Sequence, residues 1–400
     1  MKTAAIIAEY NPFHNGHKYH IEETRRLTGA DFILVVMSGD FVQRGAPAIF
    51  NKYLRTQMAL LGGADLVLEL PCLYAVSSAE FFAGGSVSLL SRLGVVDYLS
   101  FGSECGDIHT IKDCAELLLS EPAPYRQLLS SFLKQGMSFP AARSKALYQT
   151  AGNASPLSEI PDLLSSPNNI LALEYCKALF ALHSPIMPVT VKRLGDAYHE
   201  TSLNDDCSIF SSAAAIRKTI ENADSSESFL TSDDFSSLLH YRLLTEYQHG
   251  FTEYLDCNSE LSRRIVKYLP DFTDFTGFSA LLKSKNITHT KVNRALFHIL
   301  LHITTPDSYL KPIFKRELLT PYARLLGFRK EASVLLSAIK KNGEIPIISK
   351  LADAGNILDA HGLAMLEQDI FSSSIYESVF SQKYKKKLPV NEYRQSPIIL

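Results

Sequence analysis

The chain of 400 residues predicts an α/β domain with a five-stranded parallel sheet, followed by a mostly α-helical C-terminal domain. Two observations predict this fold class. Five apolar runs, typical of strands buried on both faces, alternate with stretches of helical periodicity in the first half of the chain. After a polar segment at residues 222–228 the strand signal fades, and helical patterns continue to about residue 341. We therefore expect two domains, residues 1–220 and 221–400.

The expected strands share an apolar core and a polar or glycine-rich end. They are residues 3–8, 31–37, 65–71, 95–101 and 189–193. The helices expected to connect them include residues 17–27, 52–61, 77–93 and 171–182, with Arg55 on a polar face of the second. Ligands of open parallel sheets gather at the carboxyl ends of the strands. Residues that directly follow these strands are therefore the candidates for a site.

Composition excludes several classes of protein. Hydrophobic residues make up 46% and charged residues 20%, with a formal net charge of −2, so any nucleic-acid-binding surface must be local. The chain has no apolar run of about 18 residues and no pattern of a cleavable export signal, so we expect a cytoplasmic protein without a membrane span. The 6 cysteines have no zinc-binding or redox spacing, and we expect them to be reduced.

The turn after the first strand is the part of the sequence that most clearly predicts a binding site. Asn11-Pro12 ends the strand, Gly16 allows close backbone approach, and a helix follows. Orphan N–H groups and the positive end of the helix dipole make such a turn an anion site. His14 and His17, three residues apart, can aim at one polyphosphate as imidazolium or neutral N–H donors. Incidental histidines at a helix start are the plainer alternative.

Other strand ends add polar candidates for the same crevice. Ser38 and Asp40 follow the second strand, Gly102 the fourth and Arg193 the fifth. The pair Asn168 and Asn169 begins a helix, where an amide could cap the helix or bind a nucleotide.

The segment after the fifth strand adds a hydroxyl and a guanidinium. Ser211 or Ser212 would cap a helix that carries Arg217 in its second turn. This arrangement suits a polyphosphate, although an ordinary surface helix would look the same.

Basic residues cluster locally in the second half of the chain. The clusters are Lys283, Lys285, Lys291 and Arg294, then Arg316, Arg324, Arg329 and Lys330, and finally the tail Lys383, Lys385, Lys386 and Lys387. Local clusters in a chain of nearly zero net charge favour a segregated phosphate-binding face, although solvated helix surfaces are the alternative.

Taken together, the motifs resemble a known family. The strand pattern, the His-x-Gly-His sequence and the segment ending in Ile216-Arg217 resemble the nucleotidyltransferase superfamily, which has a Rossmann-like domain. Residues 8–17, 36–45, 101–104 and 166–171 narrow the resemblance to the bacterial tRNA(Met) cytidine acetate ligases, along nearly the whole chain. One departure is Ala214, where relatives in the superfamily often carry Ser or Thr, and this puts a phosphate contact in doubt.

The resemblance implies an ATP-dependent ligase. It would activate acetate as acetyl-adenylate, release pyrophosphate and acetylate N4 of the wobble cytidine of elongator tRNA(Met), with Mg²⁺ present only as the counter-ion of ATP. The ATP-binding residues so implied, together with those argued above, are Ile7, Ala8, Glu9, Tyr10, Asn11, Pro12, Phe13, His14, Asn15, Gly16, His17, Lys18, Tyr19, His20, Gly102, Asn168, Asn169, Arg193, Ser212 and Arg217.

Roles within the site follow from this reaction. We expect His14 and His17 to bind phosphates and Arg217 to bind the β/γ end of ATP. Ser38 and Asp40 would shape the acetate and amine pocket, with Asp40 hypothesised to accept a proton from the cytosine N4 group. The tRNA backbone would lie on Lys283, Lys285, Lys291, Arg294, Arg329 and Lys330. The oligomeric state is left open, and no dedicated metal ligands are predicted.

Three rival functions remain. A small-molecule adenylyltransferase would share the first domain but rarely has so long a helical second half. A class I aminoacyl-tRNA synthetase also uses His-x-Gly-His, but the chain lacks a convincing Lys-Met-Ser-Lys-Ser loop. An RNA-binding protein with a relic nucleotide site is disfavoured by the intact His14, Gly16, His17 and Arg217, which cannot by themselves establish turnover.

Overall fold

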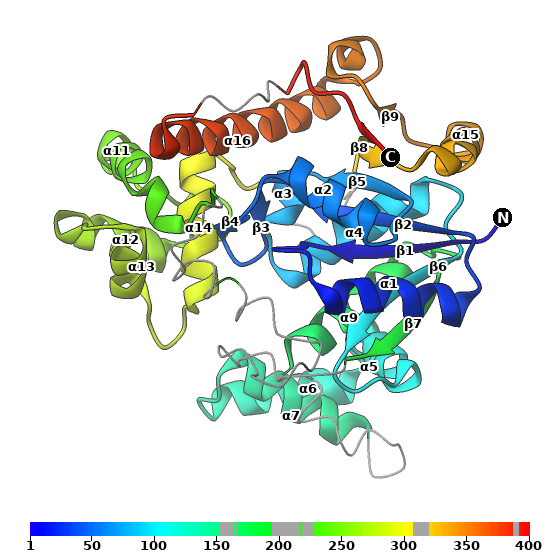
Figure 1. Cartoon of the computed structure of the whole chain (residues 1–400). Coiled ribbons are helices and arrows are strands. Elements are labelled where there is room, and N and C mark those ends of the chain that lie inside the picture. Colours follow the sequence, from blue (N-terminus) through cyan, green and yellow to red (C-terminus); the bar gives the residue numbers. More distant parts are fainter. Residues whose placement is uncertain (152–163, 165, 194–216, 218–227, 307–319, 387–391) are drawn as a thin grey trace, which may run out of the picture.

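A single wide sheet forms the centre of the molecule. The computed structural model describes residues 1–151, 164, 166–193, 217, 228–306, 320–386 and 392–400. The strands are β1 (Thr3–Ala8), β2 (Phe32–Ser38), β3 (Phe41–Val42), β4 (Ala46–Pro47), β5 (Leu66–Leu70), β6 (Tyr98–Ser103), β7 (Met187–Lys192), β8 (Ala323–Phe328), β9 (Ile347–Ile348) and β10 (Ile398–Ile399). Their order in the eight-stranded sheet is β10-β8-β5-β2-β1-β6-β7, with β9 beside β8 (Figure 1).

The five predicted parallel strands are confirmed. β1, β2, β5, β6 and β7 are parallel, and Ile7 of β1 pairs with Val36 of β2, which pairs with Leu68 of β5. Strands at the centre of the sheet are buried on both faces, which explains why they read as continuous apolar runs rather than as alternating ones. The α/β fold class is likewise confirmed.

The C-terminal half is mostly helical but also contributes strands to the central sheet. Strand β8 pairs antiparallel with β5, while β9 and β10 pair with β8. Three strands from beyond residue 300 therefore widen the sheet from five strands to eight. The boundary at residues 220 and 221 stays a prediction because it falls outside the described residues.

Helices cover both faces of the sheet. They are α1 (Asn15–Thr28), α2 (Lys52–Leu61), α3 (Cys72–Ala75), α4 (Ala79–Arg92), α5 (Ile108–Ser120), α6 (Ala123–Lys134), α7 (Phe139–Ala151) and α9 (Pro167–Ala181). On one face Ile6 and Val35 pack with Ile21 of α1 and Leu60 of α2. The opposite face is part of the larger core, which α4 and α9 complete.

The second half of the chain adds a helical part and a long helix. Its elements are the 3₁₀ helices η2 (Ser232–Phe235), η3 (Leu269–Asp271), η6 (Lys330–Ala332) and η7 (Leu351–Asn356), and the α-helices α11 (Ser236–Glu246), α12 (Ser259–Tyr268), α13 (Phe275–Leu282), α14 (His289–Leu301), α15 (Ser333–Asn342) and α16 (Ala360–Tyr384). Helices α11 to α14 lie beyond the end of the sheet toward which β1 points (Figure 1).

Close backbone packing joins this helical part to the sheet. Gly45, between β3 and β4, has φ +71°, and an added Cβ would stand 2.3 Å from the backbone nitrogen of Arg294 in α14. A side chain at this position is therefore excluded both by the backbone conformation and by space.

No helix in the described part of the chain is both long and apolar enough to cross a membrane. The five described cysteines (Cys72, Cys105, Cys114, Cys176 and Cys257) are free thiols, and Cys105 alone among these five is not fully buried.

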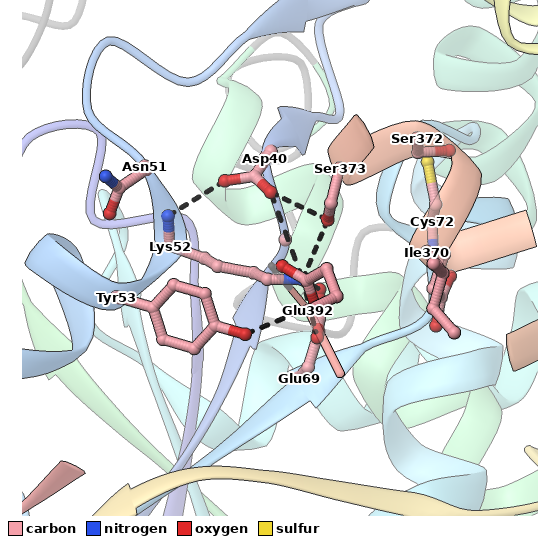
Figure 2. A network of polar contacts seen from close by, with 12 residues as sticks. Asp40, Asn51, Lys52, Tyr53, Glu69, Cys72, Ile370, Ser372, Ser373 and Glu392 are labelled. Atoms are coloured by element: carbon pink, nitrogen blue, oxygen red, sulfur yellow. Dashed lines mark hydrogen bonds and ion pairs between the residues drawn. The ribbon is translucent and has the colours of Figure 1, made fainter. Parts of the chain in front are cut away.

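A buried cluster of charges ties four segments together. Lys52 Nζ of α2 lies 2.9 Å from Glu69 Oε1 of β5 and 3.1 Å from Glu392 Oε2 near the C-terminus. Arg324 of β8, grouped from the sequence with the local basic clusters, pairs with both carboxylates in this buried cluster. The side chains of Lys52, Glu69, Arg324 and Glu392 are each 5% exposed or less, and Figure 2 shows Lys52, Glu69 and Glu392 converging. Taking such charges out of water is costly, so each depends on the others for compensation.

Glu392→Gln is expected to destabilise the fold. Burial raises the pKa of Glu392, but the charges of Lys52 and Arg324 outweigh burial and lower the pKa to about 2. A carboxylate whose folded pKa is depressed stabilises the fold above its unfolded pKa of roughly 4.3, and this is lost as pH falls toward 2. Replacing the Glu392 carboxylate leaves the buried charges of Lys52 and Arg324 only partly compensated. We expect the free energy of unfolding to fall by about 3 kcal/mol near pH 7.

Urea unfolding between pH 7 and pH 3 tests this, with Glu331→Gln at an exposed position as the control. The difference between Glu392→Gln and wild type should shrink as the pH falls. A Glu392→Gln protein as stable as wild type at pH 7 would contradict the role of the cluster.

Candidate functional site

The predicted turn forms the N-terminal cap of α1. His14 is the N-cap, in extended conformation, and its Nδ1 accepts a hydrogen bond of 3.0 Å from the backbone N–H of Gly16. The N–H of His14 donates in return to Nδ1 of His17, at 3.3 Å. The two rings stack with centroids 3.7 Å apart. The helix therefore begins at Asn15, two residues before the expected start, because an imidazole takes the place of the usual Ser or Asp cap.

The cap fixes the protonation state of both imidazoles. Burial and the charges of Arg193 and Arg217 lower the pKa of His14 to about 4. Burial and the neighbouring His14, His20 and Arg193 hold the pKa of His17 well below its usual value. Both rings are therefore neutral at pH 7, and since each Nδ1 accepts, each proton is on Nε2. Of the two states expected from sequence, burial and the neighbouring cations favour the neutral donor.

Two guanidinium groups make the surroundings positive. Arg193 follows β7, and its backbone N–H donates to the Ser103 carbonyl at 3.0 Å. Its charge acts on His14, His17 and His20 together. Arg217 donates from Nη1 to the Asn11 carbonyl in the turn, at 2.6 Å. Cations and neutral N–H donors at a helix N-terminus form a seat for an anion.

Other predicted ATP-binding residues of the turn have structural partners. His20 Nε2 lies 3.0 Å from Ser100 Oγ of β6, which links α1 to the sheet. Asn11 Oδ1 accepts from the backbone N–H of Ile49. The Tyr10 ring packs edge-on against His17 and Phe13, with centroids 4.8 and 4.9 Å away.

The remaining residues of the expected set differ in exposure. Phe13 packs against Gly62, where an added Cβ would stand 2.2 Å from its ring. Glu9 Oε1 accepts from the backbone N–H of Gln43. Asn15 and Lys18 are exposed, and Lys18 pairs with Glu22 on the surface. Ile7 and Ala8 end β1, Pro12 lies between β1 and α1, and Gly16 and Tyr19 belong to α1. Ser212 lies outside the described residues.

Arg55 holds the ends of β1 and β2 at this edge. The expectation that it lies on a polar face is wrong, because the residue is fully buried. Its guanidinium donates to the carbonyls of Glu9 (2.6 Å) and Ser38 (3.1 Å), and also to that of Gly39. A buried guanidinium that satisfies strand-end carbonyls fixes the backbone on which the turn begins.

The carboxyl end of β6 and the start of α9 lie next to each other. Gly102 lies beneath the side chain of Arg193, whose Cγ would be 3.4 Å from an added Cβ. Asn169 is buried, and its Oδ1 accepts from the backbone N–H groups of Glu104 and Cys105. Asn168 is only half-buried and donates to Glu104 Oε1. The structure therefore separates a structural Asn169 from a more accessible Asn168.

Ser38 and Asp40 are buried rather than open to a crevice. Asp40 Oδ1 accepts from the backbone N–H of Lys52, and Oδ2 accepts from Ser373 Oγ at 2.8 Å (Figure 2). Burial raises the pKa of Asp40, and the charges of Lys52 and Arg55 offset part of this increase. Ser38 Oγ is buried and has no hydrogen-bond partner in the described part of the chain.

The predicted basic residues separate into three kinds. Lys283 and Lys285 are exposed next to α13, and Lys291 is half-buried at the start of α14. Arg294 is engaged, since its Nε lies 2.7 Å from Asp256 Oδ2. Arg329 and Lys330 follow β8, where the backbone N–H of Arg329 donates to the Asp65 carbonyl and that of Lys330 donates to the Leu400 carbonyl. They lie at the amino end of the parallel strands, opposite the carboxyl end that carries His14.

Some residues that shape the site were missed from the sequence. The sequence pattern assigns no role to Glu104 or Lys52. Their partners are distant in the chain, so periodicity gives no signal for them. Within the described ranges, no group of three or more His, Cys, Asp or Glu side chains is placed to hold a metal ion.

Comparisons with known proteins agree with this geometry. The family model described as HIGH Nucleotidyl Transferase matches residues 1–390. Proteins named tRNA(Met) cytidine acetate ligase from Clostridium perfringens and Acetivibrio thermocellus are 38% and 37% identical, with all of each chain covered.

Two crystal structures of Thermotoga maritima TmcAL also match over the full length of both chains. The apo form has a TM-score of 0.90 at 29% identity, and the form bound with alpha-thio ATP has 0.88 at 28%. The resemblance stated from the sequence is confirmed. The chain belongs to the HIGH nucleotidyl transferase family and to the tRNA(Met) cytidine acetate ligases.

Proposed function

We propose that this protein activates acetate with ATP and transfers the acetyl group to N4 of the wobble cytidine of elongator tRNA(Met). The observation that carries the proposal is the pair of neutral imidazoles His14 and His17 at the N-terminus of α1, beside Arg193 and Arg217. The Thermotoga maritima relative has been solved bound with alpha-thio ATP, which supports a nucleotide in this family.

The chemistry needs charge neutralisation more than acid–base catalysis. An acetate oxygen attacks the α-phosphorus, the bond to the bridging oxygen breaks, and pyrophosphate leaves with that electron pair. Charge spreads over the phosphate oxygens during this step, and the Nε2–H donors of His14 and His17 would stabilise it. Arg217 would hold the β/γ end. Mg²⁺ would enter with ATP as its counter-ion.

The second step transfers the acetyl group. The cytosine N4 amine attacks the acetyl carbon, AMP leaves, and the amine loses one proton. We assign Ser38 to the acetate pocket, since its buried hydroxyl lacks a partner among the described residues and lies at the carboxyl end of β2. Asp40 has both oxygens engaged, so we assign it to holding this edge of the sheet through Lys52 and Ser373.

We assign tRNA contact to the helical part. Helices α11 to α14 lie beyond the carboxyl edge of the parallel strands, on the same side as the His14 turn (Figure 1). Lys283 and Lys285 are exposed there, whereas Arg294 is already paired with Asp256. Exposed lysines suit phosphate contacts that position a nucleic acid without reading its sequence. The wobble base would leave its loop stack to reach the adenylate.

Replacing His17 is expected to abolish adenylation. His17→Asn is preferred to His17→Ala because an amide oxygen can still accept the N–H of His14, whereas the Nε2–H donor is lost. Acetate-dependent exchange of labelled pyrophosphate into ATP should fall at least ~100-fold, in line with loss of one charge-stabilising donor. tRNA binding should be nearly unchanged.

The control is His361→Ala, an exposed position at the start of α16. If His17→Asn exchanges pyrophosphate into ATP at the wild-type rate, His17 has no role in adenylation.

Neutralising Lys283 and Lys285 is expected to weaken tRNA binding but not adenylation. Each lost phosphate contact should reduce the slope of log affinity against log salt by roughly 0.7 to 0.9. Titration of tRNA(Met) at salt concentrations from about 50 to 200 mM measures this for Lys283→Gln/Lys285→Gln. The matched control is Lys340→Gln/Lys341→Gln, two exposed lysines of α15. An equal loss of pyrophosphate exchange in the first variant would contradict the division of labour.

A further inference from the structure

The end of β6 and the start of α9 hold each other through four hydrogen bonds. Glu104 Oε1 accepts from Asn168 Nδ2 at 2.6 Å, and Oε2 accepts from the backbone N–H of Asn169 at 2.9 Å. Asn169 Oδ1 in turn accepts from the backbone N–H of Glu104 at 2.9 Å and of Cys105 at 3.2 Å. We call this reciprocal set the Glu104 clasp.

The clasp supplies a cap that the local sequence lacks. Ser166 is the N-cap of α9 but makes no side-chain cap hydrogen bond. The N–H of Asn169, third in the helix, has no partner within the helix and is satisfied by Glu104 instead. A carboxylate at a helix N-terminus is also favoured by the helix dipole. The position of α9 relative to β6 therefore depends on Glu104.

The clasp also fixes which way the Asn168 amide faces. A carboxylate only accepts hydrogen bonds, so the amide nitrogen must face Glu104 and the amide oxygen must face away. In the described part of the chain no group donates to that oxygen, and Asn168 is half-buried rather than fully exposed. A fixed acceptor of this kind suits a donor group on a ligand.

The Glu104 clasp lies close to the anion site formed by His14, His17 and Arg193. Glu104 comes two residues after Gly102, and its charge acts on Arg193, the same residue whose charge acts on His14 and His17. The Arg193 backbone also donates to Ser103, next to Glu104. The fixed acceptor and the phosphate-facing turn therefore share the carboxyl edge of neighbouring strands.

We propose that Glu104 is a positioning residue for the nucleoside end of ATP, which orients the Asn168 amide oxygen to accept a hydrogen bond from the nucleoside. The proposal rests on the proposed function in that ATP lies at this edge. The donor is a ribose hydroxyl or the 6-amino group of adenine, because the nucleoside part of ATP has no other N–H or O–H group.

Exchanging the two partners tests the clasp. Glu104→Gln can accept from Asn169 but presents an amide N–H to the Asn168 amide nitrogen, and Asn168→Asp places two carboxylates together. In Glu104→Gln/Asn168→Asp the introduced amide donates to the introduced carboxylate and still accepts from Asn169, so the clasp and its single negative charge are restored. We expect each single variant to raise the KM for ATP about tenfold, the effect of one lost hydrogen bond, with kcat within about twofold.

The double variant should return to within about threefold of wild type. Glu116→Gln, an exposed carboxylate of α5, is the control. A structural role alone would lower the unfolding temperature of the single variants without moving KM for ATP. That result, or a double variant as impaired as the product of the singles, overturns the proposal.

Nucleotide analogues identify the donor. Dissociation constants are measured by calorimetry for 2′-deoxyATP, 3′-deoxyATP and purine riboside triphosphate, which lacks the 6-amino group. One of the three should bind wild type about tenfold more weakly than ATP, and this penalty should vanish in Asn168→Ala. A penalty that persists in Asn168→Ala, or no penalty for any analogue, overturns the proposal.

Calorimetry also separates the two proposals. If wild type binds ATP but gives no acetate-dependent exchange, the proposed function fails, while the analogue series still decides the role of Glu104. If wild type binds no ATP, both fail.

Discussion

The fold depends on the buried charges around Lys52. Lys52, Glu69, Arg324 and Glu392 come from α2, β5, β8 and the C-terminal segment, and none of them has water to compensate its charge. Such a cluster contributes little net stability compared with apolar packing. Removal of one member, however, leaves the remaining buried charges without compensation and destabilises the fold. The four charges are therefore compensated only when all four segments are in place.

The same cluster reaches the candidate site through Asp40. Its two oxygens join the start of α2 to Ser373 of α16, directly after the strand that carries Ser38. Arg55, one turn further along α2, holds the carbonyls of Glu9 and Ser38. The backbone that leads into the His14 turn is thus fixed by α2, and the mutual cap of His14 and His17 then orients the two imidazoles.

The sequence predicts those elements whose structure depends on residues close together in the chain. Central strands such as β2 are apolar on both faces, so they could be predicted from the sequence, and the start of the helix after the first turn was predicted to within two residues. Strand β8 was missed because its Arg324 and Gly327 interrupt an apolar run of only six residues. Asp40 was expected to face a crevice because it follows a strand, yet Ser373, 333 residues away, covers it. The role of Glu104 likewise depends on hydrogen bonds to Asn168 and Asn169 of α9, which lie 64 and 65 residues later in the chain.

The position of β8 has a consequence for biosynthesis. Strand β5 lies at the edge of the parallel sheet until residues 323–328 pair with it, more than 250 residues later in the chain. During translation at about 5–20 residues per second, that hydrogen-bonding edge stays open for tens of seconds while the rest of the chain emerges from the ribosome. A nascent chain of this protein therefore passes through a long window in which an unpaired strand is available to other chains, and chaperone protection would matter most in that window.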